Sequence, residues 1–459
     1  LFTLVLSVTS APAETLKAVI NASHQYLPSF EPSTAYLRVD LEGIRPRGVN
    51  RAPLNLALVI DRSGSMSGQK IEDAKNAAIY VIRQLQAEDI VSVVTYSDSV
   101  EVMIPATKVS DRNVLIQRIR QIQSNGNTAL FAGVSKGAAE VRKFLSNQRI
   151  NRVILLSDGL ANVGPSSPQE LAQLGRSLSR ETISVSTLGI GQGYNEDLMT
   201  KLAYNSDGNH VFVAQSSELA DIFTQELNEL FGATAKDICI RIHVSDAFRI
   251  VRWLGREGEI RGNSATITLN QVSDRQEKYV MLELSQDPSV SANDVLYATA
   301  EVDFLDPFKA GRVQEQLRFD FNRTHDSHKI ELGLNKDVIA DATMQIATLN
   351  SEKAVTLRDE GKLKEAEETF RQNAEYLIQA QKDYDLPALE PAVSGNFADA
   401  ESVYDEAEWE SKRKQLREEQ ATVRTSQAVG SSDNRYLKPN TNSSPSTKQD
   451  SDSKSKSNN

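Results

Sequence analysis

Five oxygen-bearing side chains have the types and the placement expected of a binding site for a hard divalent cation. Asp61, Ser63 and Ser65 lie in the run Asp-Arg-Ser-Gly-Ser, and Thr128 and Asp158 follow later in the chain. Hard cations such as Mg²⁺ prefer oxygen ligands and usually retain several waters, so a few hydroxyls with one or two carboxylates suffice. We therefore predict a metal site made of these residues, with Mg²⁺ as the first choice and Mn²⁺ or Ca²⁺ as alternatives.

The segments next to these residues predict elements that would bring them together. Asp61 follows an apolar strand at 55–60, Asp158 follows a second strand at 152–157, and Thr128 lies in a loop just before a predicted helix. In a doubly wound sheet, ligands bind in the crevice at the carboxyl ends of the strands, where the winding direction reverses. We expect the three loops to meet there.

Short apolar runs alternate with amphipathic segments over residues 53–232, which predicts a single α/β domain. The remaining strands are expected at 90–96, 100–104, 183–188 and 210–214, and the helices at 70–85, 113–123, 130–145, 169–179, 196–204 and 218–230. Such alternation implies a doubly wound, mostly parallel, Rossmann-like sheet with helices on both faces.

The residues on either side of this domain show the alternating pattern of β-strands. Residues 233–330 lose the helical period, which predicts an antiparallel β domain resembling a sandwich. The N-terminal segment 14–52 contains another alternating strand, at 35–41. We expect this strand to pair with the β domain, so that the α/β domain is inserted between strands of one sandwich.

The C-terminal third changes character twice. Two amphipathic segments within 335–390 predict a helical hairpin, and 391–425 is a charged stretch for which a helix is one interpretation. Residues 426–459 are rich in Ser, Asn, Lys and Asp and are expected to form a disordered tail.

The start of the chain resembles a truncated signal peptide. An apolar run precedes Thr-Ser-Ala-Pro-Ala, which matches a cleavage site after Ala13 and gives a signal segment of 1–13. The alternative is a short buried strand or helix at a true N-terminus. No later segment approaches the roughly 18 consecutive apolar residues of a membrane-spanning helix. We therefore expect an exported, periplasmic or extracellular protein without a membrane span.

Charge and motif content argue against several other functions. A formal net charge of −11 disfavours nucleic-acid binding, and the single cysteine, Cys239, excludes an internal disulfide and a Cys-based zinc site. The run Gly189–Gly193 lacks the residues of a phosphate-binding loop, and no hydrolase motif is present. His325 and His328 lack metal-ligand partners at suitable spacing, and His210 is isolated. An enzyme is therefore not expected.

The order, spacing and strand-end placement of the five residues resemble the metal-ion-dependent adhesion site of von Willebrand factor A domains. Each piece alone is an ordinary turn, but the combination is not. The resemblance covers 53–232 and looks most like the bacterial and inter-alpha-trypsin-inhibitor heavy-chain branch of that superfamily.

This resemblance implies a role for each residue. Ser63, Ser65 and Thr128 would ligate the cation, directly or according to state, while Asp61 and Asp158 would contact it mainly through water. Because few carboxylates bind directly, the cation stays electrophilic, and a Glu or Asp of a partner can complete its coordination. In some relatives this engagement shifts the Thr128 loop and the last helix of the domain.

Two functions follow as expectations. The first is an exported binding protein that engages an acidic residue of a protein partner through the metal. The alternative is an assembly or scaffolding subunit of an envelope complex, in which the metal fixes a subunit contact and the helical hairpin docks a second protein.

Overall fold

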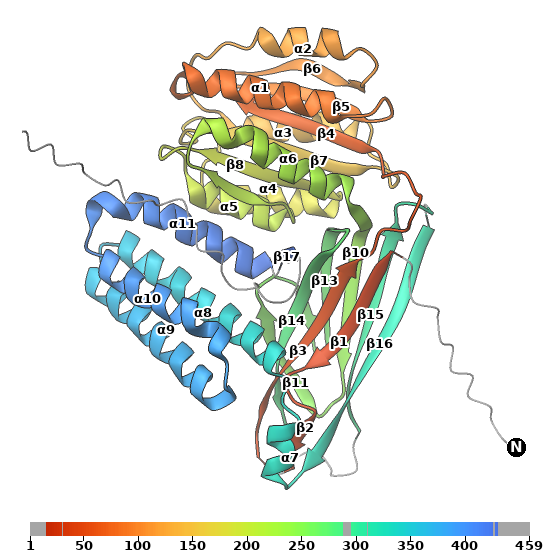
Figure 1. Cartoon of the computed structure of the whole chain (residues 1–459), viewed down its shortest axis with the longest axis vertical. Helices are drawn as coiled ribbons and strands as arrows, with labels where there is room; N and C mark the ends of the chain where they lie inside the picture. Colours follow the sequence, from red (N-terminus) through yellow and green to blue (C-terminus); the bar gives the residue numbers. More distant parts are fainter. Residues whose placement is uncertain (1–14, 30, 288–294, 310, 426, 430–459) are drawn as a thin grey trace, which may run out of the picture.

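A computed structural model of the chain describes residues 15–29, 31–287, 295–309, 311–425 and 427–429. Figure 1 shows three parts: an α/β domain at the top, a β-sandwich below it and a bundle of helices beside both. The predicted signal segment, 1–13, lies outside the described residues. None of the described helices has the length and apolarity to cross a membrane.

The α/β domain is built on a six-stranded sheet with the order β6-β5-β4-β7-β8-β9. Its strands are β4 (Leu54–Asp61), β5 (Ile90–Tyr96), β6 (Val100–Lys108), β7 (Ile150–Ser157), β8 (Ile183–Ile190) and β9 (His210–Val213). All neighbours run parallel except β5 and β6, which confirms the predicted doubly wound sheet. Because successive strands are added to opposite sides of β4, the binding crevice of such a fold lies beside the carboxyl end of β4.

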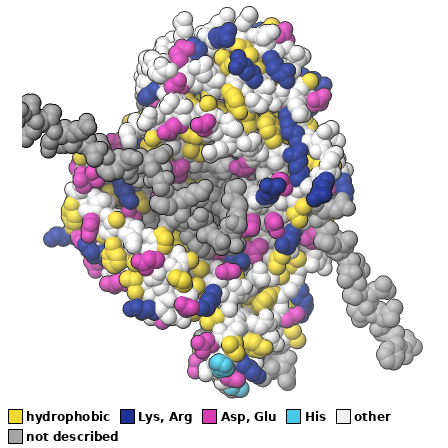
Figure 2. Space-filling model, viewed as in Figure 1, with side chains coloured by type: hydrophobic (Ala, Val, Ile, Leu, Met, Phe, Trp, Pro, Cys, Tyr) yellow, Lys and Arg dark blue, Asp and Glu magenta, His cyan; other side chains and the backbone are white. Residues whose placement is uncertain are grey.

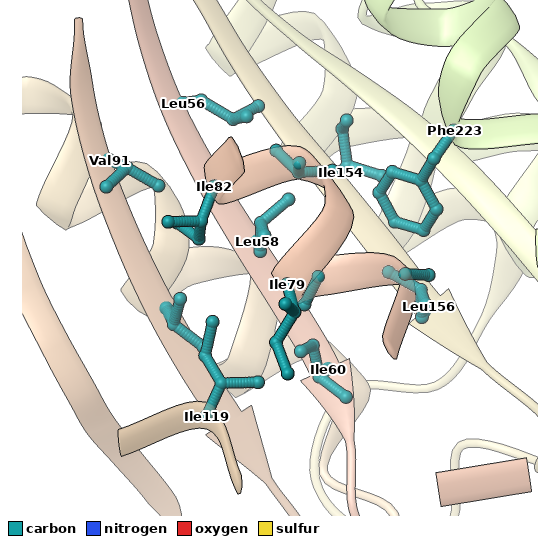
Figure 3. Close-up of a cluster of buried hydrophobic side chains, with 14 of the residues drawn as sticks. Leu56, Leu58, Ile60, Ile79, Ile82, Val91, Ile119, Ile154, Leu156 and Phe223 are labelled. Carbon is teal, nitrogen blue, oxygen red and sulfur yellow. The ribbon is translucent and has the colours of Figure 1, made fainter. Parts of the chain in front are cut away.

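Helices cover both faces of this sheet, because successive side chains of β4 point to opposite faces and all are buried. The helices are α1 (Gln69–Gln84), α2 (Arg112–Arg120), α3 (Leu130–Arg142), α4 (Pro168–Arg180), α5 (Glu196–Asn205) and α6 (Leu219–Phe231). Leu56, Leu58 and Ile60 pack against the α1 and α6 side, as Figure 3 shows, whereas Ala57 and Val59 pack on the opposite face, with α3. Complete burial of each large aliphatic side chain contributes about 2 kcal/mol.

The β-sandwich consists of two sheets. The first has the order β1-β3-β14-β11, with β17 also on β14, and comprises β1 (Leu16–Ala22), β3 (Thr34–Gly43), β14 (Gln276–Gln286), β11 (Phe248–Leu254) and β17 (Gln427–Val429). The second has the order β12-β13-β10-β15-β16-β2 and comprises β12 (Glu259–Arg261), β13 (Ser264–Ser273), β10 (Ala233–Val244), β15 (Leu296–Asp306), β16 (Gly311–Thr324) and β2 (Tyr26–Pro28). Within the described residues, β16 and β2 are the one pair of adjacent strands in these two sheets that runs parallel.

The N-terminal strand β3 pairs antiparallel with β14, with Val39 opposite Val280, as the sequence predicted. The chain therefore leaves the sandwich after β3, forms the α/β domain, and returns at β10. These two crossings lie side by side, because the Arg51 guanidinium stacks 4.3 Å from the centre of the Phe231 ring. Arg51 also donates to the buried carboxylate of Asp89, at 2.9 Å.

The expectation of disorder from residue 426 onward is wrong for Gln427–Val429. These residues form β17, which pairs with Gln276–Lys278 on β14. Strand β11 pairs with β14 only from Gln286 to Met281. On that side, the backbone of β14 before Met281 can therefore pair with another strand. Composition did not reveal this pairing because strand hydrogen bonds come from the backbone. Residues 430–459 lie outside the described part of the chain.

The predicted hairpin is present but is not an isolated pair of helices. It consists of α8 (Lys336–Asp359) and α9 (Leu363–Tyr384), preceded by the short α7 (Ser327–Leu332). The charged stretch forms α10 (Glu390–Ser402) and α11 (Glu406–Thr425), which complete a bundle. Figure 1 shows α11 lying between the bundle and the α/β domain. Basic residues of α11 pair with Glu196 and Asp197 of α5, which periodicity alone could not reveal.

The three parts meet at the buried carboxylate of Asp207, in the loop between α5 and β9. It accepts hydrogen bonds from the Arg256 guanidinium and from the backbone N–H of Asn270, both at 2.6 Å. Arg256 also donates to the carbonyl of Thr425, at the end of α11. Burial opposes ionisation of Asp207, but nearby Lys278 and Arg256 outweigh it, and the pKa of Asp207 is lowered.

We expect Asp207→Asn to reduce the free energy of unfolding by about 3 kcal/mol or more, because it leaves buried cations without their counter-charge. Asparagine tolerates the left-handed backbone that Asp207 adopts, with φ of 54°, so the substitution isolates the loss of charge. Urea unfolding followed by circular dichroism measures the change. The control, Glu259→Gln, removes a pair with Arg261 in which both side chains are exposed, and should change stability by less than about 0.5 kcal/mol. Equal effects would contradict the prediction.

Candidate metal centre

Asp61, the last residue of β4, lies at the centre of the candidate site. Its buried carboxylate accepts a hydrogen bond from the backbone N–H of Ser63 at 2.8 Å through Oδ1. Its Oδ2 accepts from the hydroxyl of Ser157, on β7, at 2.7 Å. Burial raises the pKa of Asp61; these hydrogen bonds oppose the rise, and the nearby Asp158 adds to it. A bound cation would favour the ionised form.

The two serines of the first motif lie on the turn that follows β4. A short 3₁₀ helix, Gly64–Met66, places their hydroxyls 3.0 Å apart. The hydroxyl of Ser65 donates to Oδ1 of Asp158 at 2.7 Å, which links the first and last parts of the predicted site. Ser63 is buried whereas Ser65 is exposed, so the cluster opens to solvent on the Ser65 side.

Thr128 approaches the same point from the loop before α3. Its backbone N–H donates to Oδ1 of Asn162 at 2.9 Å, and the N–H of Asn162 donates back to its carbonyl at 3.2 Å. A Cβ added at Gly159 would lie 3.2 Å from Oγ1 of Thr128 and 3.4 Å from Oγ of Ser65. Both hydroxyls therefore face the space beside Gly159, which a larger residue would crowd. The structure thus brings all five predicted residues together.

Three residues at the site were not among the predicted ligands. Ser157 and Asn162 hold Asp61 and Thr128 in place, and their proximity to Asp158 in sequence was the only available signal. The third is Lys70, in the first turn of α1, whose Nζ lies 2.5 Å from Oδ2 of Asp158. Nothing in its spacing indicated this contact.

The loop between β8 and α5 connects the site to the helical bundle. A Cβ at Gly193 would lie 3.0 Å from the carbonyl of Asp158, so this loop packs directly on the site. The neighbouring Tyr194 accepts a hydrogen bond at its carbonyl from Nζ of Lys414, on α11, at 3.1 Å. The same ammonium pairs with Glu196 at 2.8 Å.

His210 is isolated from metal-ligand residues in the sequence but has hydrogen-bond partners in the fold. Its imidazole is buried, with Nδ1 2.9 Å from the hydroxyl of Thr187 and Nε2 3.3 Å from that of Tyr194. These partners come from other strands and loops, so the local sequence could not identify them. His325 and His328 are exposed as expected, and histidines are visible at the lower end of the molecule beside α7 in Figure 2.

The donor set fits a hard divalent cation. It offers three hydroxyls and two carboxylates, and hard cations prefer oxygen over nitrogen or sulfur. In the described residues, no group of three or more His, Cys, Asp or Glu side chains could hold a metal ion, so a cation here needs the hydroxyls. The Lys70 ammonium also stands where a positive charge balances Asp158.

The fold and the five residues define a doubly wound α/β domain with hydroxyls and carboxylates clustered at its crevice. Residues 55–225 match the family model of the von Willebrand factor type A domain. The chain therefore carries a von Willebrand factor type A domain, as the motif indicated. Domains of this family are typically interaction modules that bind a divalent metal at the adhesion site.

Curated relatives and solved structures agree with this assignment. The chain is 26% identical over 267 residues to the uncharacterized protein sll0103 of Synechocystis, with 56% of this chain and 63% of that protein covered. It is 30% identical over 187 residues to human inter-alpha-trypsin inhibitor heavy chain H3, with 38% and 20% covered. The chain thus spans less than two thirds of either relative. A von Willebrand factor type A protein from Catenulispora acidiphila shares the fold, with a TM-score of 0.67 and 15% identity, over 82% of this chain and 89% of that one.

We expect the stability of the protein to fall between pH 6.5 and pH 4 because of His210. Burial lowers the pKa of His210 to about 4 from its ordinary value of 6.5, so the unfolded chain binds a proton in this range and the folded chain does not. The loss amounts to about 3 kcal/mol on completion at low pH. Unfolding by urea with a chelator present should therefore show a flatter pH profile for His210→Gln than for the wild type. The exposed His328→Gln should leave the profile unchanged; a similar flattening there would contradict the assignment.

Proposed function

We propose that the chain is an exported, non-enzymatic binding protein that holds Mg²⁺ at this site and captures an acidic side chain of a protein partner. One observation carries the proposal: Asp61, Ser63, Ser65, Thr128 and Asp158 meet at the carboxyl edge of the sheet, with Ser65 exposed to solvent. This oxygen-rich cluster is held by hydrogen bonds within the domain and is exposed to solvent at Ser65. Such a cluster suits a cation that shares its coordination with a second molecule.

Each residue has a part in this proposal. Ser63, Ser65 and Thr128 would hold the cation, and the charges of Asp61 and Asp158 would attract it. When bound, the cation supplies an electrophilic position that a carboxylate of the partner can fill. The chain itself keeps these groups oriented through hydrogen bonds, as when Asp61 accepts from the N–H of Ser63.

The rim of the site offers a second kind of contact. Leu160 follows Gly159 directly and is 58% exposed, so it presents an apolar side chain to solvent beside the site. We propose that an apolar group of the partner, next to its acidic residue, covers Leu160. Such a pairing of one charged and one apolar contact would add specificity to a cation that by itself accepts any accessible carboxylate.

The structure favours this function over the assembly role. Docking of a second protein on the bundle would need an apolar surface there, yet within 336–425 only Tyr404 among the large apolar side chains is exposed. The hairpin instead packs on the sandwich through Val338 and Ala342, beside Leu254 and Met281.

We expect the wild-type protein to bind Mg²⁺ and Asp158→Asn to weaken this binding more than about 100-fold, because a direct or water-mediated contact loses its charge. Ser157→Ala should weaken it about tenfold, because Asp61 loses an orienting hydrogen bond. Isothermal titration calorimetry measures both. Ser92→Ala is the matched control: that serine is also buried in the sheet but lies near the carbonyl of Leu56. Unchanged affinity in Asp158→Asn would exclude the metal site.

We further expect capture of the partner to depend on both the cation and Asp158. In cross-linking mass spectrometry on the native source cells, cross-links from the α/β domain to the partner should disappear in Asp158→Asn and on chelation. Cross-links that survive both treatments and join the partner to the helical bundle would instead support the assembly role.

A further inference from the structure

We propose that Lys70 competes with the divalent cation for Asp158 and thereby determines the cation affinity of the site. The proposal rests on the metal site proposed above and adds a residue that belongs to neither predicted motif. In the absence of the cation, the ammonium of Lys70 occupies the carboxylate; when the cation binds, Lys70 leaves it.

The two carboxylates of the site require a positive charge. Asp61 and Asp158 are both fully buried, at 0% and 1% exposure, and the pair brings two negative charges together. Both oxygens of Asp61 are taken by uncharged donors, from Ser63 and Ser157. Within the described residues, Lys70 is the only cation paired with either carboxylate, through the 2.5 Å contact to Asp158.

The arginine inside the first motif does not perform this role. The guanidinium of Arg62 donates to the amide oxygen of Asn125 and lies 4.0 Å from Glu101, away from both buried carboxylates. Neutralisation of the site therefore depends on a residue from α1, and not on the cation nearest in sequence.

The position of Lys70 on α1 is unfavourable unless it has such a partner. Lys70 is the second residue of the helix, where the positive end of the helix dipole favours acidic residues and disfavours a cation. Pairing with Asp158 offsets this repulsion. The Lys70 ammonium therefore stays at Asp158 because of the negative charge of the site. It leaves readily once another cation neutralises that charge.

Lys70 can leave without rearrangement of the backbone. Its side chain is 38% exposed, whereas that of Asp158 is completely buried. A long, flexible lysine side chain can therefore turn into solvent while the carboxylate stays in place. Because the ammonium and a divalent cation repel each other, a cation that draws on Asp158 must displace Lys70, and this displacement lowers its affinity.

The first test is titration of the full chain with Mg²⁺ alone. Lys70→Met keeps most of the length of the side chain and removes its charge, so we expect Mg²⁺ to bind about tenfold more tightly, equivalent to about 1.4 kcal/mol. Lys75→Met is the matched control, because Lys75 lies on the same helix but pairs with Glu72 at 2.7 Å. Its Mg²⁺ affinity should equal that of the wild type. Equal or weaker binding by Lys70→Met would overturn the proposal.

The second test follows the lysine itself and needs no variant. Amine-reactive labelling of the wild-type protein, quantified by mass spectrometry, should modify Lys70 several-fold faster in Mg²⁺ than in chelator. Labelling of Lys75 should be the same in both. Labelling of Lys70 that is unchanged or slower in Mg²⁺ would show that the cation does not displace it.

The two tests separate this proposal from the one on which it rests. If wild-type and Lys70→Met proteins both fail to bind Mg²⁺, the metal site itself is wrong. If the wild type binds Mg²⁺ and Asp158→Asn does not, while Lys70→Met matches the wild type, the site is right and the competition is wrong.

Discussion

One buried carboxylate is linked by hydrogen bonds to all three parts of the structure. Asp207 lies in a loop of the α/β domain, is bound by Arg256 of the sandwich, and through that guanidinium is linked to the last carbonyl of α11. Buried charges are costly unless they are paired and hydrogen-bonded, so this contact is satisfied only when all three parts are in place. Separation of any one part would leave buried charges without their partners, which is strongly destabilising.

The candidate site also contains a buried carboxylate that needs a counter-charge, but here the counter-charge can exchange. At Asp207 the counter-charges are enclosed, whereas at Asp158 the only paired cation among the described residues is a half-exposed lysine. One carboxylate is permanently neutralised and stabilises the architecture. The other keeps an exchangeable cation, as a binding site requires. The β8–α5 loop joins the site to the bundle, because Gly193 contacts Asp158 and Tyr194 contacts Lys414 of α11.

The sheet and the five site residues could be predicted because their signals are local. An apolar run followed by Asp61, or by Asp158, marks the end of a buried strand, and the order of the strands follows from the alternation with helices. The supporting contacts could not be predicted in this way. Lys70 and His210 meet partners that are distant in the sequence. The charged sequence of α11 is equally compatible with a solvent-exposed helix and with one whose charges are paired. Backbone pairing by residues 427–429 left no trace in composition.

The insertion of the α/β domain also bears on how the chain folds. Strand β3 cannot pair with β14 until the intervening chain brings its two ends together, and closing a long flexible loop costs entropy. The folded α/β domain removes most of that cost, because Arg51 and Phe231, at its entry and exit, are in contact. Loop-closure entropy therefore favours a sequence of events in which the inserted domain forms first and acts as a short linker for the sandwich.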